Sequence, residues 1–134
     1  MKNRIIELSK QEIDIYRKKI ISDKNVFLAE INGEKINNES DYVKAMVKAL
    51  KIPFKIPFLK LGYLEDCICD LMWIKAENIV IIIHSFDLML IEDVETKNRI
   101  ITFFQKVVLP WWEGEVVGHM VDGKTRAFSV YLEQ

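Results

Sequence analysis

The sequence predicts an α/β fold in which helices cover a small, mainly parallel β-sheet. Two segments have the β-branched and apolar character of strands, Val26–Ile31 and Asn78–His84. The second is a continuous apolar run, which is typical of a parallel strand buried on both faces. Segments with apolar residues at helical spacing separate and follow these strands, and this alternation favours parallel pairing through helical crossovers.

Length and composition indicate one compact unit with a substantial core. The chain has 134 residues, half of them hydrophobic, with few glycines and prolines, which excludes disorder. The longest aliphatic run, Ile79–Ile83, is too short to cross a bilayer, and residues 1–15 lack the apolar core of a signal peptide. Cys67 and Cys69 lie two apart in a predicted helix, so their side chains diverge and no disulfide is expected. We therefore expect a cytoplasmic protein.

The N-terminal segment predicts a helix. Ser9 followed by Glu12 is the signature of a capping box, which places a helix from about Lys10 to Ile21. Its apolar positions then recur at helical spacing: Ile13, Tyr16 and Ile20. We interpret residues 1–25 as a helical extension packed on a main domain formed by residues 26–134.

The next segment predicts a turn, a helix and a loop. The first predicted strand ends at Asn32-Gly33, a strong turn signal, and Ser40 can cap the helix that follows. Pro53 and Pro57 prevent that helix from continuing and favour an extended loop. One apolar stripe identifies the core-facing side of the helix: Val43, Met46, Val47 and Leu50.

A third helix is predicted from about Lys60 to Trp73. Its buried stripe follows the i, i+3, i+4, i+7, i+8 pattern through Leu64, Cys67, Ile68, Leu71 and Met72. The opposite face then presents Gly62, Asp66, Cys69, Asp70 and Trp73.

This polar face has two interpretations. In the first, Trp73 packs against a loop and the two aspartates are solvated. In the second, the face binds a protein, because an aromatic anchor beside carboxylates suits a partner that supplies arginines or lysines. Asp66 and Asp70 lie one turn apart and repel each other, so they add nothing to helix stability.

The last third of the chain predicts a helix and a hairpin. Residues Glu95 to Leu109 are amphipathic, and Pro110 is expected to end that helix. Asp122-Gly123 lies between the β-like segments Glu115–Val121 and Lys124–Leu132, which predicts a C-terminal β-hairpin.

The charge is unevenly distributed along the chain. The formal net charge is −1, yet residues 61–95 contain eight acidic groups and Lys75 alone, a local charge of −7. Such a surface attracts a cationic protein and repels nucleic acid and anionic lipid, so neither nucleic acid nor a membrane is expected as a partner. The eight acids are Glu65, Asp66, Asp70, Glu77, Asp87, Glu92, Asp93 and Glu95.

The segment Asp66–Leu71, followed by Trp73 and the aliphatic strand Ile79–Ile83, resembles the second-helix and second-strand signature of the barstar family. Members of this family are small intracellular inhibitors of secreted ribonucleases. Upstream of this motif, Ile31–Ile36 resembles the family's first strand and turn, and Asp41–Leu50 resembles its first helix. Downstream, Ala127–Gln134 resembles its final strand. It implies a barstar-like fold, to which the N-terminal helix would be an addition.

The resemblance places Asp66 at the family's main toxin-contacting aspartate, which occupies the phosphate-binding site of the nuclease. Other positions depart from the family pattern. Glu65 replaces an aromatic, Gly62 replaces an acid, and the glutamate of the later helix falls near Gln105 or Lys106. The residues expected to contact a partner are Asp66, Asp70, Glu65, Tyr63, Gly62, Trp73 and Cys69.

The function implied is that of an inhibitor or immunity protein that blocks a cationic ribonuclease or related toxin through an acidic helix face. The alternative is a barstar-like adaptor that binds another basic protein. No cofactor, metal or catalytic activity is expected.

Signals for other functions are weaker. Cys67 lies on the buried stripe, and Cys69 lies among carboxylates that oppose thiolate formation. His84 ends the central strand, where an α/β hydrolase could place a base, although a hydrogen-bonded structural histidine is more common. Asp66, Asp70 and His84 could together ligate a metal, but their spacing matches no familiar site. Trp111-Trp112 either bind a partner or close the core beneath a helix end.

Overall fold

The computed structural model describes residues 3–134 as a four-stranded, wholly parallel β-sheet with helices on both faces. The strand order is β1-β4-β3-β2, so β1 and β2 form the two edges. The strands are β1 (Arg4–Leu8), β2 (Val26–Asn32), β3 (Asn78–His84) and β4 (Ala127–Glu133). The predicted α/β class with parallel pairing is therefore confirmed.

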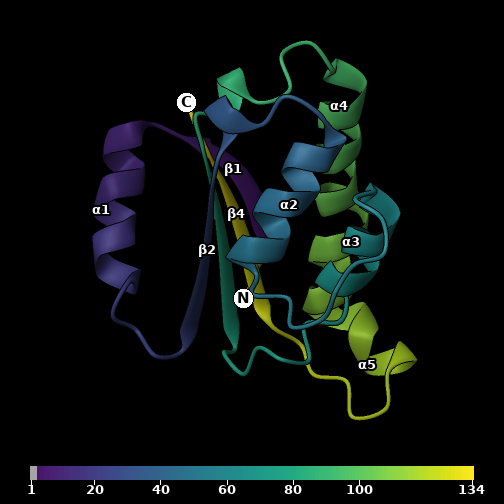
Figure 1. Ribbon diagram of the computed structural model, residues 1–134. Coiled ribbons are helices and arrows are strands. Elements are labelled where there is room, and N and C mark those ends of the chain that lie inside the picture. Colours follow the sequence, from purple (N-terminus) through teal and green to yellow (C-terminus); the bar gives the residue numbers. More distant parts are fainter. Residues whose placement is uncertain (1–2) are drawn as a thin grey trace.

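Figure 1 shows three layers, with α1 alone on one face of the sheet and the remaining helices on the other. Among residues 3–134, no helix has both the length and the apolar character that a membrane span requires. The α-helices are α1 (Lys10–Ile20), α2 (Glu39–Ala49), α3 (Leu61–Ile68), α4 (Val94–Phe103) and α5 (Val116–His119). Short 3₁₀ turns, η1 (Gly33–Lys35) and η2 (Phe86–Leu88), follow β2 and β3, and two π-helical turns, η3 (Phe104–Val108) and η4 (Trp111–Glu115), follow α4.

Side-chain caps set the beginnings of α1 and α2. The Ser9 hydroxyl accepts a hydrogen bond from the Glu12 amide, and the Glu12 carboxylate accepts one from the Ser9 amide, which completes the predicted capping box. In α2 the cap is Asn38, whose side chain accepts from the Asp41 amide at 2.8 Å. The expectation that Ser40 caps this helix is wrong, because the helix begins one residue before it.

The N-terminal segment contributes a strand as well as a helix. β1 pairs in parallel with β4, from Arg4 opposite Ser129 to Leu8 opposite Glu133. A five-residue strand with only two adjacent isoleucines gives little periodic signal, and its partner lies at the other end of the sequence. The division of the chain at residue 25 stays a prediction.

The predicted C-terminal hairpin is wrong. Residues 115–119 belong to η4 and α5, and only Ala127–Glu133 forms a strand. Asp122-Gly123 lies in a turn, in which the Gly123 amide donates to the Met120 carbonyl, but that turn joins a helix to a strand. Because β4 lies between two parallel neighbours, it has no antiparallel partner in the sheet.

The helix that begins at Val94 also continues past Pro110, contrary to the prediction that it ends there. Pro110 keeps helical dihedral angles, with φ of −63° and ψ of −37°. The π-helical turns η3 and η4 flank it, and their wider i→i+5 hydrogen bonding accommodates a residue that has no amide proton. One long helix therefore continues past Pro110, with a π turn on each side of the proline.

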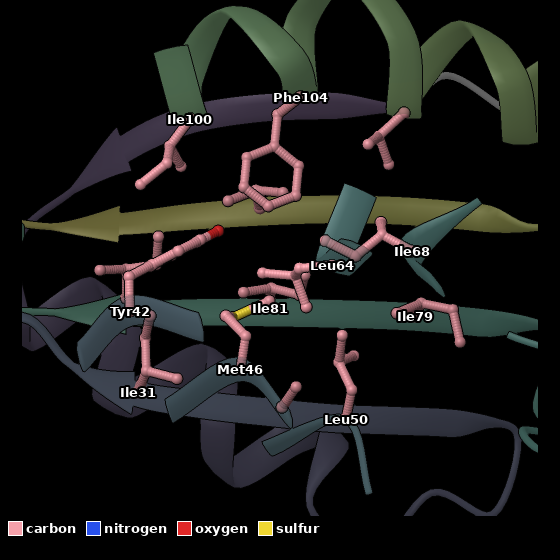
Figure 2. Packing of buried hydrophobic residues seen from close by; sticks show 14 of the residues in the cluster. Ile31, Tyr42, Met46, Leu50, Leu64, Ile68, Ile79, Ile81, Ile100 and Phe104 are labelled. Atoms are coloured by element: carbon pink, nitrogen blue, oxygen red, sulfur yellow. The ribbon is translucent and has the colours of Figure 1, made fainter. Parts of the chain in front are cut away.

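The sheet buries apolar side chains on both faces, as the run in β3 predicts. Ile79, Ile81 and Ile83 face the α2–α4 side, and Figure 2 shows Ile81 among Met46, Leu64 and their neighbours. On the other face, Val80 and Ile82 join a second cluster with three further buried residues: Ile13, Ile20 and Tyr131. The larger core anchors the layer of helices that carries the candidate site.

Candidate partner-binding site

The helix α3, which carries Asp66, is shorter than predicted. It ends at Ile68 rather than at Trp73, and Leu71 turns into the core with a left-handed φ of 48° and no exposed surface. The indole of Trp112 donates to the Ile68 carbonyl at 3.0 Å, and the guanidinium of Arg126 donates to the Leu71 carbonyl at 3.0 Å. The indole thus satisfies a carbonyl that the end of α3 leaves without a helical partner, and the guanidinium holds the turn that follows.

The early end of α3 moves Trp73 away from Asp66. The Trp73 indole donates to the Leu50 carbonyl at 2.8 Å, and its ring meets Phe54 edge to face with centroids 5.8 Å apart. Trp73 is half-buried against the core. The structure therefore places Trp73 against the loop after α2, as in the first of the two interpretations.

Four carboxylates form an acidic patch, which we define as Glu65, Asp66, Asp70 and Glu115. The pKa of Cys69 is raised to about 11. Burial is the largest cause, and the negative charges of Asp66, Glu65 and Glu115 add to it. Burial and the charges of Asp70 and Asp66 likewise raise the pKa of Cys67. Both thiols are therefore protonated at neutral pH, which is unfavourable for a nucleophile.

Glu115 was not predicted as a member of this site. It belongs to η4, within the segment that the sequence assigns to a strand of a hairpin. Because the helix continues past Pro110, Glu115 comes close enough to Cys69 to act on its pKa. Its acidic side chain was visible in the sequence, but its position depends on the two π turns.

The four carboxylates differ in what they contact. Glu65 forms an ion pair with Arg99 of α4 at 3.0 Å. Asp70 is half-buried, and its charge acts on Arg126. Asp66 and Glu115 are exposed, and neither carboxylate has a hydrogen bond or an ion pair with any residue from 3 to 134. These two carboxylates of the patch are therefore open to an external cation.

Exposed aromatic rings lie on the same helix and on the loop before it. Phe58 is 63% exposed and Tyr63 is 42% exposed, and their ring centroids are 5.9 Å apart. Gly62 directly precedes Tyr63, and a side-chain carbon added there would meet no atom within 4 Å. An aromatic pair beside an open carboxylate is typical of a protein-binding surface.

His84 lies on the α1 side of the sheet, away from α3. Its two ring nitrogens contact carboxylate oxygens of Glu133 at 2.6 Å and Glu30 at 2.7 Å, and Glu30 also pairs with Arg17 at 2.9 Å. The structure therefore gives His84 the hydrogen-bonded structural role. Within residues 3–134, no three His, Cys, Asp or Glu side chains are grouped so that they could hold a metal ion.

The contacts of His84 predict a pH-dependent stability. Burial lowers the pKa of His84, but the hydrogen bonds and charges of Glu30 and Glu133 outweigh it and raise the pKa above its usual value of 6.5. A raised pKa stabilises the fold fully below pH 6.5, and this contribution is lost as the pH rises through the folded-state pKa. Relative to His84→Gln, the wild type should lose unfolding free energy as the pH rises above 6.5 and through the folded-state pKa, which urea melts over a pH series measure.

His119→Gln is the matched control, because His119 is exposed on α5. This variant should follow the wild-type pH dependence. If His84→Gln also followed it, the two carboxylates would not be coupled to the protonation of His84.

The tandem tryptophans occupy different positions. Trp112 is buried and caps α3 through its indole. Trp111 is half-buried and packs against His119, with ring centroids 5.7 Å apart. Trp112 therefore belongs to the core and Trp111 packs against it, which favours the second of the two interpretations of this pair.

The geometry describes a small α/β domain that presents an acidic, partly aromatic surface on one helix. Residues 26–133 match the family model described as Barstar (barnase inhibitor). The chain belongs to the barstar family, as the motif around Asp66 predicts.

A search of curated protein sequences found no match. Among solved structures, the chain is similar to the Aeropyrum pernix ORC2 protein in its ADPNP-ADP complexes, with 14% sequence identity and a TM-score of 0.47. That similarity covers 98% of this chain and 34% of the other. It carries no argument about function.

Proposed function

We propose that this protein inhibits a cationic ribonuclease or related toxin by binding it through the acidic patch. The observation that carries the proposal is Asp66, an exposed carboxylate without an internal partner, at the position where the family's toxin-contacting aspartate falls. The exposed rings of Phe58 and Tyr63 would supply apolar contact beside it.

The protein would inhibit the nuclease by occupying its active site. A nuclease active site uses cationic side chains to hold the phosphates of RNA, and a row of carboxylates can occupy the same positions. Asp66 would meet the central cation, and Asp70 and Glu115 would extend the negative surface towards α5. The ion pair with Arg99 holds Glu65 at the margin, so Glu65 contributes charge more than direct contact.

Barnase is the first target to test, because the family is described by its inhibition. Cleavage of a fluorogenic RNA by barnase should slow when the protein is added in stoichiometric amounts. If barnase stays active, co-purification from the native host identifies the actual partner. A basic nuclease would support the proposal, and a basic protein without nuclease activity would favour the adaptor.

Association kinetics test the role of the acidic surface. Raising the ionic strength from ~0.01 M to ~0.15 M shortens the Debye length from ~30 Å to ~8 Å, so association with the partner should slow markedly. Dissociation should change less, because ions reach contacts inside a closed interface poorly. Stopped-flow measurements at the two ionic strengths check both rates.

The double variant Glu92→Gln with Glu95→Gln should also slow association while leaving dissociation nearly unchanged. Both side chains are exposed, whereas neighbouring Asp93 accepts hydrogen bonds from Thr96 at the start of α4 and is better left intact. A rate of association that did not respond to salt would mean that the acids are only a solvated surface.

A further inference from the structure

The strand β2 has an open outer edge. It is the last strand of the sheet on its side and pairs only with β3, over all seven of its residues from Val26 to Asn32. In such a strand, alternate residues direct their amide and carbonyl groups away from the sheet. Within residues 3–134, no hydrogen bond from another segment reaches the backbone of residues 27–31 on that side.

Edge strands are usually protected by proline, by an inward charge or by a covering segment, because they pair readily with other chains. β2 contains no proline and no lysine, and its apolar side chains at Val26, Phe27 and Leu28 are only half-buried. The one charged residue of β2, Glu30, pairs with Arg17 and His84, so the edge is long and carries neither a proline nor an unpaired charge that would oppose strand addition.

A groove of about 600 Å³ runs between this edge and helix α2. Four lysines line it, and none of them forms an ion pair with any residue in the part of the chain that the structure describes. Between the lysines of α2, two small half-buried residues, Ala45 and Ala49, leave room beside the strand. The lysines are Lys35, Lys44, Lys48 and Lys51.

The acids of the groove are already engaged. Glu30 contacts Arg17 and His84, and Asp41 accepts a hydrogen bond from the Asn37 amide. Lys44 and Lys48 lie one helical turn apart, an arrangement that destabilises a helix slightly through repulsion. The groove thus holds four lysines against the carboxylates of Glu30 and Asp41, which leaves an excess of positive charge.

Lys51 adds a constrained feature. It follows α2 with a left-handed φ of 53°, which is uncommon for a residue with a side chain. Its ammonium lies 5.9 Å from the ring centroid of Phe27, on the β2 edge itself. The backbone conformation and the ring together hold this charge beside the open strand.

We propose that the edge of β2 is a second binding site, which takes up an extended acidic peptide segment as an additional strand. The peptide backbone would pair with the outward amides and carbonyls of β2, and its acidic side chains would meet the lysines of the groove. The site differs in charge and in location from the acidic patch, and it stands whether or not the protein inhibits a nuclease.

A polypeptide fits this site better than a nucleic acid. Single-stranded nucleic acid needs aromatic rings with free faces for its bases to stack on. None of the described residues that line the groove is aromatic, and Phe27, on the same strand, is half-buried and lies beneath Lys51. The repeating element of the site is the row of unpaired backbone groups, which only another strand satisfies.

The test uses fluorescence anisotropy with the full chain and a labelled peptide of about nine residues that alternates Glu with Val, blocked at both ends. This peptide should bind, and the corresponding peptide with Lys in place of Glu should not. A version N-methylated at every residue keeps its charge but has no amide proton to donate from either edge, so it should bind at least about tenfold more weakly.

The variant Lys44→Glu with Lys48→Glu should weaken binding of the Glu-Val peptide at least about tenfold. Its matched control is Lys18→Glu with Lys19→Glu, which makes the same change in charge at exposed positions of α1 and should bind normally. Hydrogen exchange should show slower exchange in β2 when the peptide is bound, while residues 61–68 are unchanged.

Three results would overturn the proposal. If the N-methylated peptide bound as tightly as the unmethylated Glu-Val peptide, charge attraction alone would account for the binding. Tighter binding of an oligouridine, abolished by the same lysine variants, would assign the groove to nucleic acid. Self-association that protects β2 in the absence of peptide would show that a second copy of the chain occupies the edge. Failure of barnase inhibition would leave this experiment unaffected.

Discussion

Replacing Asp66 with alanine should weaken binding of the partner by ~2–5 kcal/mol, because one member of a desolvated charge pair is lost. The same change should alter the free energy of unfolding by no more than about 0.5 kcal/mol, since the side chain is exposed and has no hydrogen bond or ion pair with any residue from 3 to 134. Calorimetric titration and urea denaturation measure the two effects separately.

Asp14→Ala is the control for this experiment, because Asp14 is exposed on α1, on the other side of the sheet. It should bind the partner normally. Asp66→Asn should bind almost as weakly as Asp66→Ala if charge is what matters. If the partner bound the Asp66→Ala variant with unchanged affinity, Asp66 would not be part of the proposed contact.

Replacing Ile81 with alanine should cost ~2–5 kcal/mol of stability through lost burial and a cavity in the core. Ile81 has no exposed surface and lies in the middle of β3, whose neighbours on both sides are also strands. Figure 2 shows its side chain within the cluster beneath α2 and α3. Urea melts give the change in unfolding free energy, and the loss of partner binding should follow the folded fraction.

The matched variant Ile91→Ala removes the same atoms from a side chain that is 63% exposed. Its unfolding free energy should change by no more than about 0.5 kcal/mol. If the two isoleucine variants were equally stable, the assignment of β3 as the centre of the core would be wrong.

The elements that sequence patterns predict well are those whose signal is local. The capping box of Ser9 and Glu12 fixes the start of α1, and the apolar stripe through Met46 identifies the buried side of α2. The continuous apolar run of β3 predicts its burial on both faces. In each case the residues that determine the element lie within it.

The elements that were mispredicted depend on distant residues. β1 is held by β4, and α3 ends where Trp112 donates to the Ile68 carbonyl and Arg126 donates to the turn after it, so neither boundary is encoded locally. Pro110 favours the end of a helix, but the π turns around it allow the helix to continue. Tertiary contacts override local preference at all these places.

The candidate site divides in the same way. Asp66 was predicted from its helical face and from its resemblance to a family, and it lies exposed as expected. Trp73 was placed on that face only because α3 was taken to be longer than it is. Glu115 was missed, because it joins the site through a helix that the proline was expected to prevent.

The order of strands in the sheet bears on how the protein folds during its synthesis. β4 takes part in two of the three strand pairings, yet it is the last strand in the chain. A ribosome-bound chain that has not reached Ala127 can pair only β2 with β3, and α1 can pack on that pair, while β1 has no partner strand. Contacts this distant in sequence close slowly. β1 is therefore made before β4 but can pair only after it, and during that interval its unpaired backbone groups favour association with other chains.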